Sequence, residues 1–334
     1  MKRLLAAALA VLFGCATYQA QGASAELEKL KPADFPDKPV ELVVVYPAGG
    51  GMDYTARLLA KYMEKHFDNK VVVQNRTGGA GVIGHTYLAT QAKPDGYTLG
   101  VVANTMWADS LFRANNRWTY KDFEPIAFIN YDPLTWAVAT DGPFKDKSLK
   151  QIIEAAKASP GTVRVAVLGG NTSEFLAEHV EVVSGAKFTK VPFQGGAPGI
   201  TAALGGHVEI GGAFTAEYRG HIDAGKMRAV GVAGAQRSPT LPDTETFNEA
   251  LGSNEIIWQA WRYVTVPKGI PEDRKAFLIA WVNAALDDPE LQAEYRKTGA
   301  LMDRNLKDPA QISAEIDKLF ALESEFYKKS GRLK

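Results

Sequence analysis

The chain has 334 residues, a length that suits two ordinary domains better than one. Its 38 lysines and arginines balance its 38 aspartates and glutamates, so the formal net charge is zero. Because there is no basic surplus, neither nucleic acid nor an anionic membrane is an expected partner.

The N-terminus has the pattern of a secretory signal peptide. Lys2 and Arg3 precede a short apolar segment, Leu4–Phe13, and Ala23-Ser24-Ala25 offers small residues for cleavage. The segment is too short to span a membrane. We therefore expect residues 1–25 to be a signal peptide and the mature protein to be exported to the periplasm.

The single cysteine, Cys15, lies inside this leader. The run Leu12-Phe13-Gly14-Cys15 resembles a bacterial lipoprotein cleavage box, so lipid anchoring through Cys15 is one alternative. Cleavage after Ala25 is the other, and it would leave a free protein without cysteine. In both cases an intrachain disulfide is impossible, so stability must come from the core.

Apolar runs typical of strands alternate with helical segments over most of the chain. Several runs are continuously apolar, as expected for parallel strands covered on both faces. The alternation predicts an α/β architecture with mainly parallel sheets flanked by helices. The expected strands are Val40–Tyr46, Lys70–Asn75, Tyr97–Ala103, Pro125–Asn130, Trp136–Ala139, Thr162–Val167, Phe188–Val191, Val208–Gly212 and Met227–Ala233.

Helical periodicity is clearest after the first strand and at the C-terminus. Between Met52 and Phe67, apolar residues fall on one helical face. The tail reads as helices only, Glu272–Leu286, Pro289–Thr298 and Pro309–Lys329, and Asp308 before Pro309 is a good helix start.

These elements suggest two domains around a cleft. We expect residues 38–132 and 262–334 to form domain 1 and residues 133–261 to form domain 2. The chain would cross near Asp132–Trp136 and return near Ile257–Val264, so that two crossings make a hinge. The carboxyl ends of the strands, where ligands bind in such sheets, would then face one cleft.

The first glycine-rich turn follows the first expected strand and reads Pro47-Ala48-Gly49-Gly50-Gly51-Met52-Asp53. It lacks the lysine of a nucleotide-binding P-loop. The free N–H groups at the following helix start suit a carboxylate or another anion. Asp53 either caps this helix or accepts a hydrogen bond from a ligand, and both interpretations stay open.

A second glycine stretch contains Gly79, Gly81 and Gly84 in the G-x-G-x-x-G spacing. A dinucleotide site would need an acidic residue at the end of the next strand, but that strand ends at Asn104. We therefore expect an anion-binding loop or a structural turn, and no dinucleotide.

Two further turns of this kind follow later strands. Thr172 or Ser173, after Gly169-Gly170-Asn171, would donate a hydroxyl to a ligand or simply cap a helix. The turn Gln194-Gly195-Gly196 again joins a strand to a helix.

Catalytic patterns are absent from the sequence. The five histidines show no metal-binding spacing, and the chain has no G-x-S-x-G elbow. We expect no cofactor and no metal.

Several motifs in one order resemble the periplasmic substrate-binding proteins of tripartite tricarboxylate transporters, the Bug family. The resemblance covers nearly everything after the leader. It rests on Pro47–Asp53 with Arg57, Asn75–Gly84, Pro94-Asp95-Gly96-Tyr97-Thr98-Leu99, Lys121–Ala127, Ser159-Pro160-Gly161, Val191–Pro198 and Leu204–Glu209.

The resemblance implies a two-domain Venus flytrap of the periplasmic-binding-protein fold, with a helical C-terminal tail. Such a protein is a monomer that holds a small carboxylate by backbone amides and helix N-termini, without an obligatory arginine clamp, and docks on the permease subunits of its transporter. Phe193 stands where the family often has tyrosine, and Phe175 where histidine is frequent, so a less polar ligand or simple packing would explain them.

The expected ligand-binding residues form two walls. The first wall comprises Ala48, Gly49, Gly50, Gly51, Met52, Asp53, Thr77, Gly78, Gly79, Ala80, Asn104 and Thr105. The second comprises Thr172, Ser173, Phe193, Gly195, Gly196, Ala213 and Phe214. The ligand would be a dicarboxylate, a tricarboxylate, an acidic amino acid or an aromatic acid.

Two rival functions remain at this point. One is an exported hydrolase with Asp53 or Glu217 as base, although no nucleophile–base pair supports it. The other is a ligand-sensing protein that docks to a receptor kinase.

Overall fold

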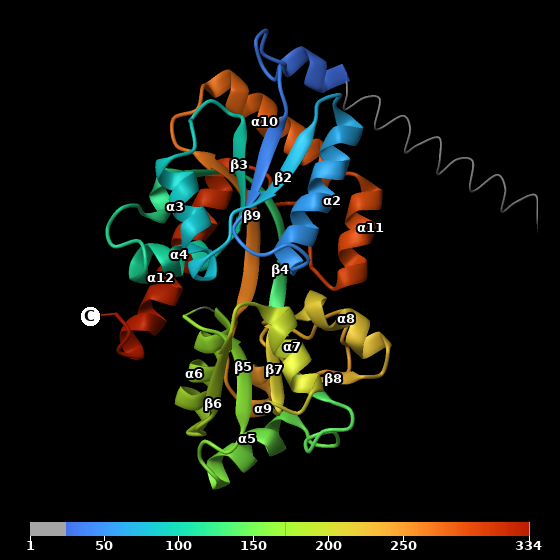
Figure 1. Cartoon of the computed structure of the whole chain (residues 1–334), viewed down its shortest axis with the longest axis vertical. Helices are drawn as coiled ribbons and strands as arrows, with labels where there is room; N and C mark the ends of the chain where they lie inside the picture. Colours follow the sequence, from blue (N-terminus) through green and yellow to red (C-terminus); the bar gives the residue numbers. More distant parts are fainter. Residues whose placement is uncertain (1–24, 171, 334) are drawn as a thin grey trace, which may run out of the picture.

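The computed structural model describes residues 25–170 and 172–333. The predicted leader, apart from Ala25, and Cys15 lie outside the described residues. Figure 1 shows two lobes, one above the other, each built from a sheet covered by helices. This arrangement confirms the predicted α/β architecture.

The first sheet contains the strands of the upper lobe in Figure 1. Strand β1 (Val40–Val44) lies between β2 (Val71–Asn75) and β3 (Thr98–Ala103), and all three are parallel. Strand β9 (Gln259–Pro267) runs antiparallel to β3, and β4 (Phe123–Ala139) runs antiparallel to β9. The parallel strands therefore end at one edge, as the expected cleft requires.

Helices cover this sheet on both sides. They are α2 (Gly51–His66), α3 (Val82–Thr90), α4 (Thr105–Phe112), α10 (Glu272–Leu286) and α11 (Pro289–Thr298), with short 3-10 turns at Gly79–Gly81 and Tyr120–Asp122.

The second sheet forms the lower lobe. Strand β5 (Arg164–Leu168) pairs in parallel with both β6 (Thr189–Phe193) and β7 (Ile210–Phe214). The far end of β4 pairs antiparallel with β7 and with β8 (Met227–Val232). The surrounding helices are α5 (Leu149–Ala158), α6 (Thr172–Ser184), α7 (Gly196–Leu204), α8 (Thr215–Asp223) and α9 (Phe247–Leu251).

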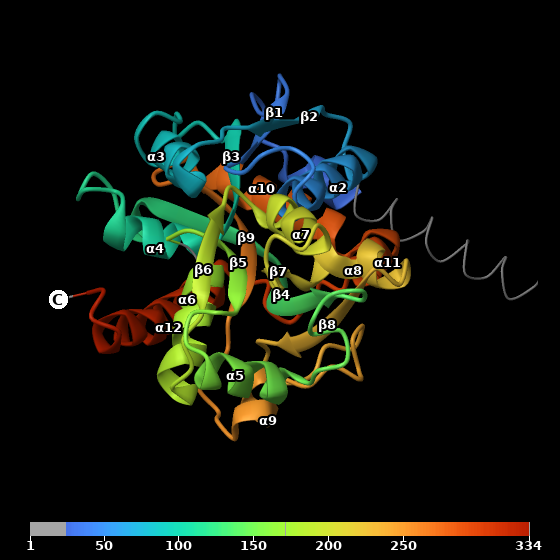
Figure 2. The ribbon, with the colours of Figure 1, turned by 60° about the horizontal axis from the view of Figure 1, so that its bottom comes forward.

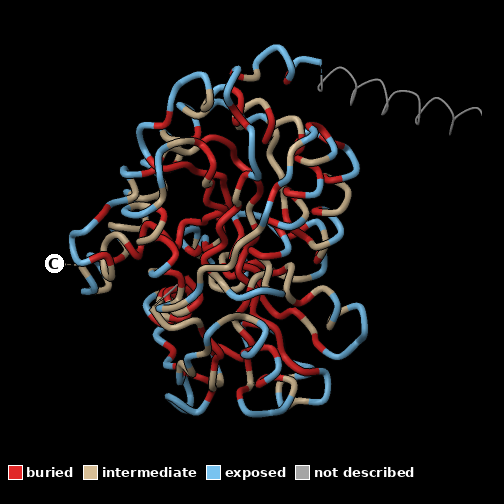
Figure 3. The backbone as a smooth tube through the Cα atoms, turned by 45° about the horizontal axis from the view of Figure 1, so that its top comes forward, coloured by how far each residue is buried: buried red, intermediate tan, exposed pale blue. Residues whose placement is uncertain are grey.

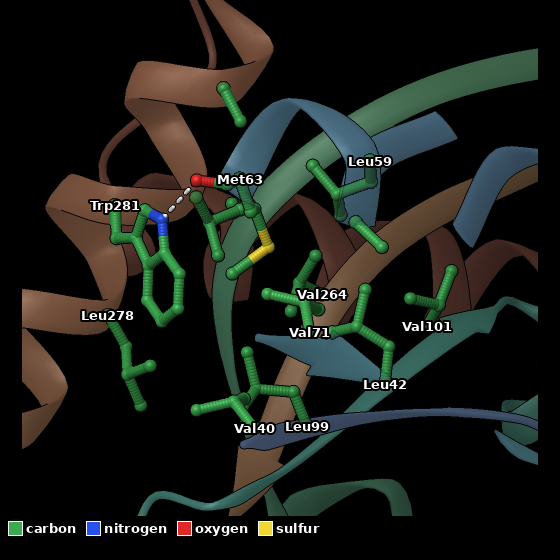
Figure 4. Packing of buried hydrophobic residues seen from close by; sticks show 14 of the residues in the cluster. Val40, Leu42, Leu59, Met63, Val71, Leu99, Val101, Val264, Leu278 and Trp281 are labelled. Atoms are coloured by element: carbon green, nitrogen blue, oxygen red, sulfur yellow. Dashed lines mark hydrogen bonds between the residues drawn. The ribbon is translucent and has the colours of Figure 1, made fainter. Parts of the chain in front are cut away.

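Each lobe has its own apolar core, visible as buried backbone inside both halves of Figure 3. In the first, the predicted apolar face of α2 packs between the sheet and α10 (Figure 4). There the indole Nε1 of Trp281 donates a 2.8 Å hydrogen bond to the carbonyl of Met63. This core fixes the start of α2 relative to β1, and so positions the loop between them.

The prediction of two separate strands at Pro125–Asn130 and Trp136–Ala139 is wrong. They are one continuous strand, β4, because Asp132 pairs with Ala260 and Pro133 with Gln259 on β9. Proline lacks an N–H, but the next residue, Leu134, donates a 2.9 Å backbone bond to the Trp258 carbonyl, so the pairing continues past Pro133. Strand β9 itself was not among the expected strands.

The C-terminal helix α12 (Pro309–Lys329) contacts both lobes. Near its start, Ile312 and Ile316 belong to a cluster with residues of the first sheet. Near its end, the ring of Tyr327 lies 5.0 Å from that of Phe175 on α6. Figure 2 shows α12 running beside α6, so the tail spans the junction between the lobes. No helix among the described residues is long and apolar enough to cross a bilayer.

Candidate functional site

A cavity of about 510 Å³ lies where the two sheets meet, and a second of about 340 Å³ adjoins it. Both are lined by Gly49–Gly51 from the first sheet and by Ala197 and Glu217 from the second. Arg262 on β9 lines both as well. The larger cavity has the size of a small-molecule site.

The first glycine loop forms one wall. Helix α2 begins at Gly51 without a side-chain cap, and Gly49 has a left-handed φ of 84°, which favours glycine. The first N–H groups of α2 therefore remain available at the cavity edge, where the helix dipole favours an anion.

Asp53 orders this loop from beneath. It is only 4% exposed, and its carboxylate accepts hydrogen bonds from the Gly49 N–H (2.9 Å), Asn75 Nδ2 (2.9 Å) and Arg57 Nε (3.0 Å). Burial alone would raise the pKa of Asp53, but the bonds from Arg57, Gly49 and Asn75 outweigh it and the pKa is lowered. Asp53 lines neither cavity.

The second wall is the turn Gln194–Pro198 at the start of α7, together with Phe214 and Glu217 near the start of α8. Helix α7, like α2, begins after a glycine, Gly195, that provides no side-chain cap. Two uncapped helix N-termini from different sheets thus border one cavity.

A buried charge pair lies at the base of the cavity. Arg262 is 3% exposed and donates from Nη2 to Asp132 Oδ2 and from Nη1 to Asn130 Oδ1, each at 3.1 Å. Burial raises the pKa of Asp132 even though Arg262 favours its charged form. Within the described chain, Arg262 Nε and Asn130 Nδ2 are buried without a hydrogen-bond partner.

Glu217 lies beside this pair. Its Oε2 accepts a 3.2 Å hydrogen bond from the Phe214 N–H. The pKa of its carboxyl is raised to about 7: burial contributes most, Asp132 adds to the rise, and the Phe214 N–H and Arg262 oppose it.

Nine of the predicted site residues line the larger cavity. They are Ala48, Gly49, Gly50, Gly51, Met52, Thr105, Gly195, Gly196 and Phe214.

The remaining predicted residues line neither of these cavities, and most have structural contacts. Asn104 donates to Glu323 Oε1 at 2.8 Å, and Ser173 Oγ accepts from the Leu168 N–H at 2.7 Å. Arg113 holds the second glycine loop, Thr77–Ala80, through Gly79 O at 3.0 Å. Thr172 and Ala213 are buried, Phe193 packs on an apolar cluster, and Phe175 packs in the core of the second lobe.

Sequence reasoning missed Arg262, Asp132 and Asn130 as site residues, and also Tyr46 and Gln194 on the cavity wall. Arg262 could have been noticed, since it is the one charge in the apolar run from Ala260 to Val266. An isolated charge in a buried strand needs a partner.

No group of three or more histidine, cysteine, aspartate or glutamate side chains that could hold a metal occurs within the described ranges. The site offers backbone N–H groups, apolar walls, the carboxyl of Glu217 and the buried Arg262–Asp132 pair. The N–H groups at the helix starts suit one end of a small organic anion.

Comparison with known proteins gives a consistent result. A family model described as "Tripartite tricarboxylate transporter family receptor" matches residues 55–319. The chain is 30% identical to the periplasmic binding protein BugD, with a TM-score of 0.81, over 89% of this chain and 99% of that one.

Two further solved structures carry ligands. MatC from Rhodopseudomonas palustris, with bound malate, is 25% identical with a TM-score of 0.79, over 89% of this chain and 100% of that one. An R. palustris protein with adipate is 26% identical with a TM-score of 0.81, over 89% and 99%. These likenesses confirm the predicted two-domain periplasmic-binding-protein fold.

Proposed function

The chain belongs to the tripartite tricarboxylate transporter receptor family, and on this premise we propose that it captures a small organic carboxylate for a membrane permease. The family consists of periplasmic solute-binding proteins, which in general are not enzymes. We extend both properties to this chain, which would bind its ligand in the periplasm and release it unchanged.

The observation that carries this proposal is the cavity between the sheets with the uncapped start of α2 at its edge. A carboxylate there would accept hydrogen bonds from the first N–H groups of α2 and meet the positive end of its dipole. The apolar walls, including Pro47, Met52 and Leu168, would cover the organic body of the ligand.

The two ligand-bearing relatives support the ligand class. One was solved with malate and one with adipate, and both molecules are small carboxylates. For this chain, contacts to both walls would favour the closed over the open arrangement, because a ligand shifts such an equilibrium only through different affinities for the two states.

A thermal-shift screen followed by calorimetry tests the proposal. The panel would contain dicarboxylates, tricarboxylates, acidic amino acids and aromatic acids. A ligand present at one hundred times its dissociation constant should stabilise the protein by about 2.7 kcal/mol, a clear rise in melting temperature. Absence of binding by every acid in calorimetry would overturn the proposal, and steady turnover of a bound acid would identify an enzyme instead.

The partner is tested separately. We expect the ligand-loaded protein, and not the empty one, to support uptake in membranes that contain the two permease subunits. Stimulation of a receptor kinase without any uptake would assign the protein to sensing.

A further inference from the structure

The two helix N-termini at the cavity differ in what already faces them. At the start of α7, the side chain of Glu217 from α8 occupies the space beside Gly196. A Cβ added to Gly196 would collide with both carboxylate oxygens of Glu217. The carboxylate therefore rests against the backbone of the first residue of α7.

This position is the one an anionic ligand would otherwise take. A carboxylate close to a helix N-terminus is stabilised by the dipole and by the unpaired N–H groups. At α7 a carboxylate of the protein, that of Glu217, already lies beside the first residue of the helix, where its charge would repel a ligand anion. At α2 a Cβ added to Gly51 would meet Arg262 Nη2 at 3.4 Å and Glu217 Cγ at 3.8 Å, and no carboxylate atom within 4 Å.

The charges around Glu217 do not neutralise it. On the strands facing it lie Asp132 of β4 and Arg262 of β9. Arg262 already forms its 3.1 Å ion pair with Asp132, so its charge is matched there. The other titratable groups near it are Tyr218 and His221 on α8 and Tyr54 on α2. Among the described residues that line either cavity, Arg262 is the only lysine or arginine.

We propose that Glu217 is a specificity-determining residue: the ligand places one carboxylate at the start of α2 and presents a hydrogen-bond donor, a hydroxyl or an ammonium group, to the Glu217 carboxylate. This inference rests on the proposed function and narrows its ligand class. A second carboxylate at the Glu217 end would meet a like charge in a site of low dielectric constant, and the two would repel each other.

The burial that raises the pKa of Glu217 to about 7 adds a pH dependence. Above that pH the repulsion is complete. Below it Glu217 carries a proton, becomes a donor and tolerates a second ligand carboxylate. Dicarboxylates should therefore bind the wild-type protein more tightly as the pH falls from 8 to 6.

The test compares ligands of equal length that differ only at one end: adipate, 6-hydroxyhexanoate and 6-aminohexanoate, and the four-carbon set succinate, 4-hydroxybutyrate and 4-aminobutyrate. Calorimetry at pH 8 and pH 6 would use wild type, Glu217→Gln and a control, Glu272→Gln. Glu272 has an 84% exposed side chain and lines neither cavity. The glutamine at position 217 keeps the size of the side chain and an acceptor for the Phe214 N–H, so the variant should fold.

At pH 8 the wild type and the control should bind a hydroxy or amino acid at least tenfold more tightly than the matching dicarboxylate. Glu217→Gln should bind the dicarboxylate at least tenfold more tightly than wild type does, and lose its pH dependence. An unchanged ranking in Glu217→Gln overturns the inference and leaves the proposed function intact. Failure of the wild type to bind any carboxylate, here or in the wider panel, overturns the proposed function and the inference with it.

Discussion

Helices α2 and α7 begin in the same way and end up with different neighbours. Each follows a strand, starts after a glycine and has no side-chain cap. Beneath the first, Asp53 bonds back to the Gly49 N–H and holds the loop open toward the cavity. Against the second, Glu217 of another helix covers the position beside Gly196.

The difference between the two helix starts shows that a glycine loop alone does not decide whether a ligand or a side chain of the protein brings the negative charge to it. At α2 the geometry leaves the anion position to a ligand. At α7 the Glu217 carboxylate lies beside Gly196 and accepts its hydrogen bond from the Phe214 N–H, so a ligand anion there would meet a like charge. The predictions below are ordered by the size of the expected effect, and each alters one side of this comparison.

Arg262→Met should have the largest effect, because Arg262 lies beneath both helix starts. Removing it leaves Asp132 buried without its partner, and breaking a buried pair in this way typically costs about 3–5 kcal/mol. Urea unfolding measures the loss. Replacing Asp132 by leucine in the Arg262→Met variant should recover most of the lost free energy of unfolding. If Arg262→Met alone is as stable as wild type, the Arg262–Asp132 pair does not stabilise the floor of the cavity.

Gly51→Leu should block the anion position at the start of α2. A side chain there points toward Arg262 and Glu217 and fills the cavity, so carboxylate affinity should fall more than 100-fold while the melting temperature changes little. The control is Gly220→Leu, since a Cβ at Gly220 meets nothing within 4 Å. Equal loss of affinity in both variants would contradict the assignment of the α2 loop.

The pH dependence of the free energy of unfolding reports on Glu217, which lies beside the start of α7. The pKa of Glu217 is raised from 4.5 to about 7, so the folded protein holds a proton that the unfolded chain loses earlier. Stability should therefore be highest below pH 4.5 with respect to this group and fall by about 3 kcal/mol as the pH rises through 7.

Glu217→Gln should flatten that fall in a series of melting curves between pH 4 and pH 8. It should not abolish it, because burial raises the pKa of Glu323 to about 7 as well. A profile identical to that of wild type would mean that Glu217 is solvated and charged throughout.

Asp53→Asn should have a smaller effect than the changes at Arg262, Gly51 and Glu217. It weakens the charge-assisted bond from the Gly49 N–H, which is worth about 1 kcal/mol, and loosens the loop enough to reduce affinity severalfold. Arg57→Gln should cost less, because the Arg57 side chain is 52% exposed. The ranking is read from denaturation and calorimetry, and a larger effect of Arg57→Gln would assign the loop order to Arg57 instead.

Much of the fold could be predicted because the ends of most helices and strands depend on residues that are neighbours in the sequence. The tail helices have the predicted bounds, since Asp288 and Asp308 each precede a proline and accept a hydrogen bond from the first turn. Strands β5 to β8 were recognised from their apolar runs, with small shifts at their ends. In contrast, the two halves of β4 were predicted as separate strands, because the pairing of Asp132 and Pro133 between them depends on β9, more than 120 residues away.

The site likewise combines features that are local in the sequence with contacts between distant segments. The glycine turns are visible in the sequence, because each joins a strand to a helix within a few residues. The association of Arg262 with Asp132 and Asn130 joins segments about 130 residues apart, so no local pattern announces it. The same holds for Glu217 and Gly196, which meet only because α7 and α8 pack together.

The continuous pairing of β4 with β9 has a consequence for the energetics of capture. The lobes are joined by hydrogen-bonded strands, whose backbone is already ordered before any ligand arrives. Closing the cleft then requires bending two paired strands, and little chain entropy is lost in the process, whereas ordering a flexible residue costs about 1–2 kcal/mol. The contacts to a small acid then have less ordering of the protein chain to offset, and the main remaining costs are the lost freedom of the ligand and the desolvation of polar groups.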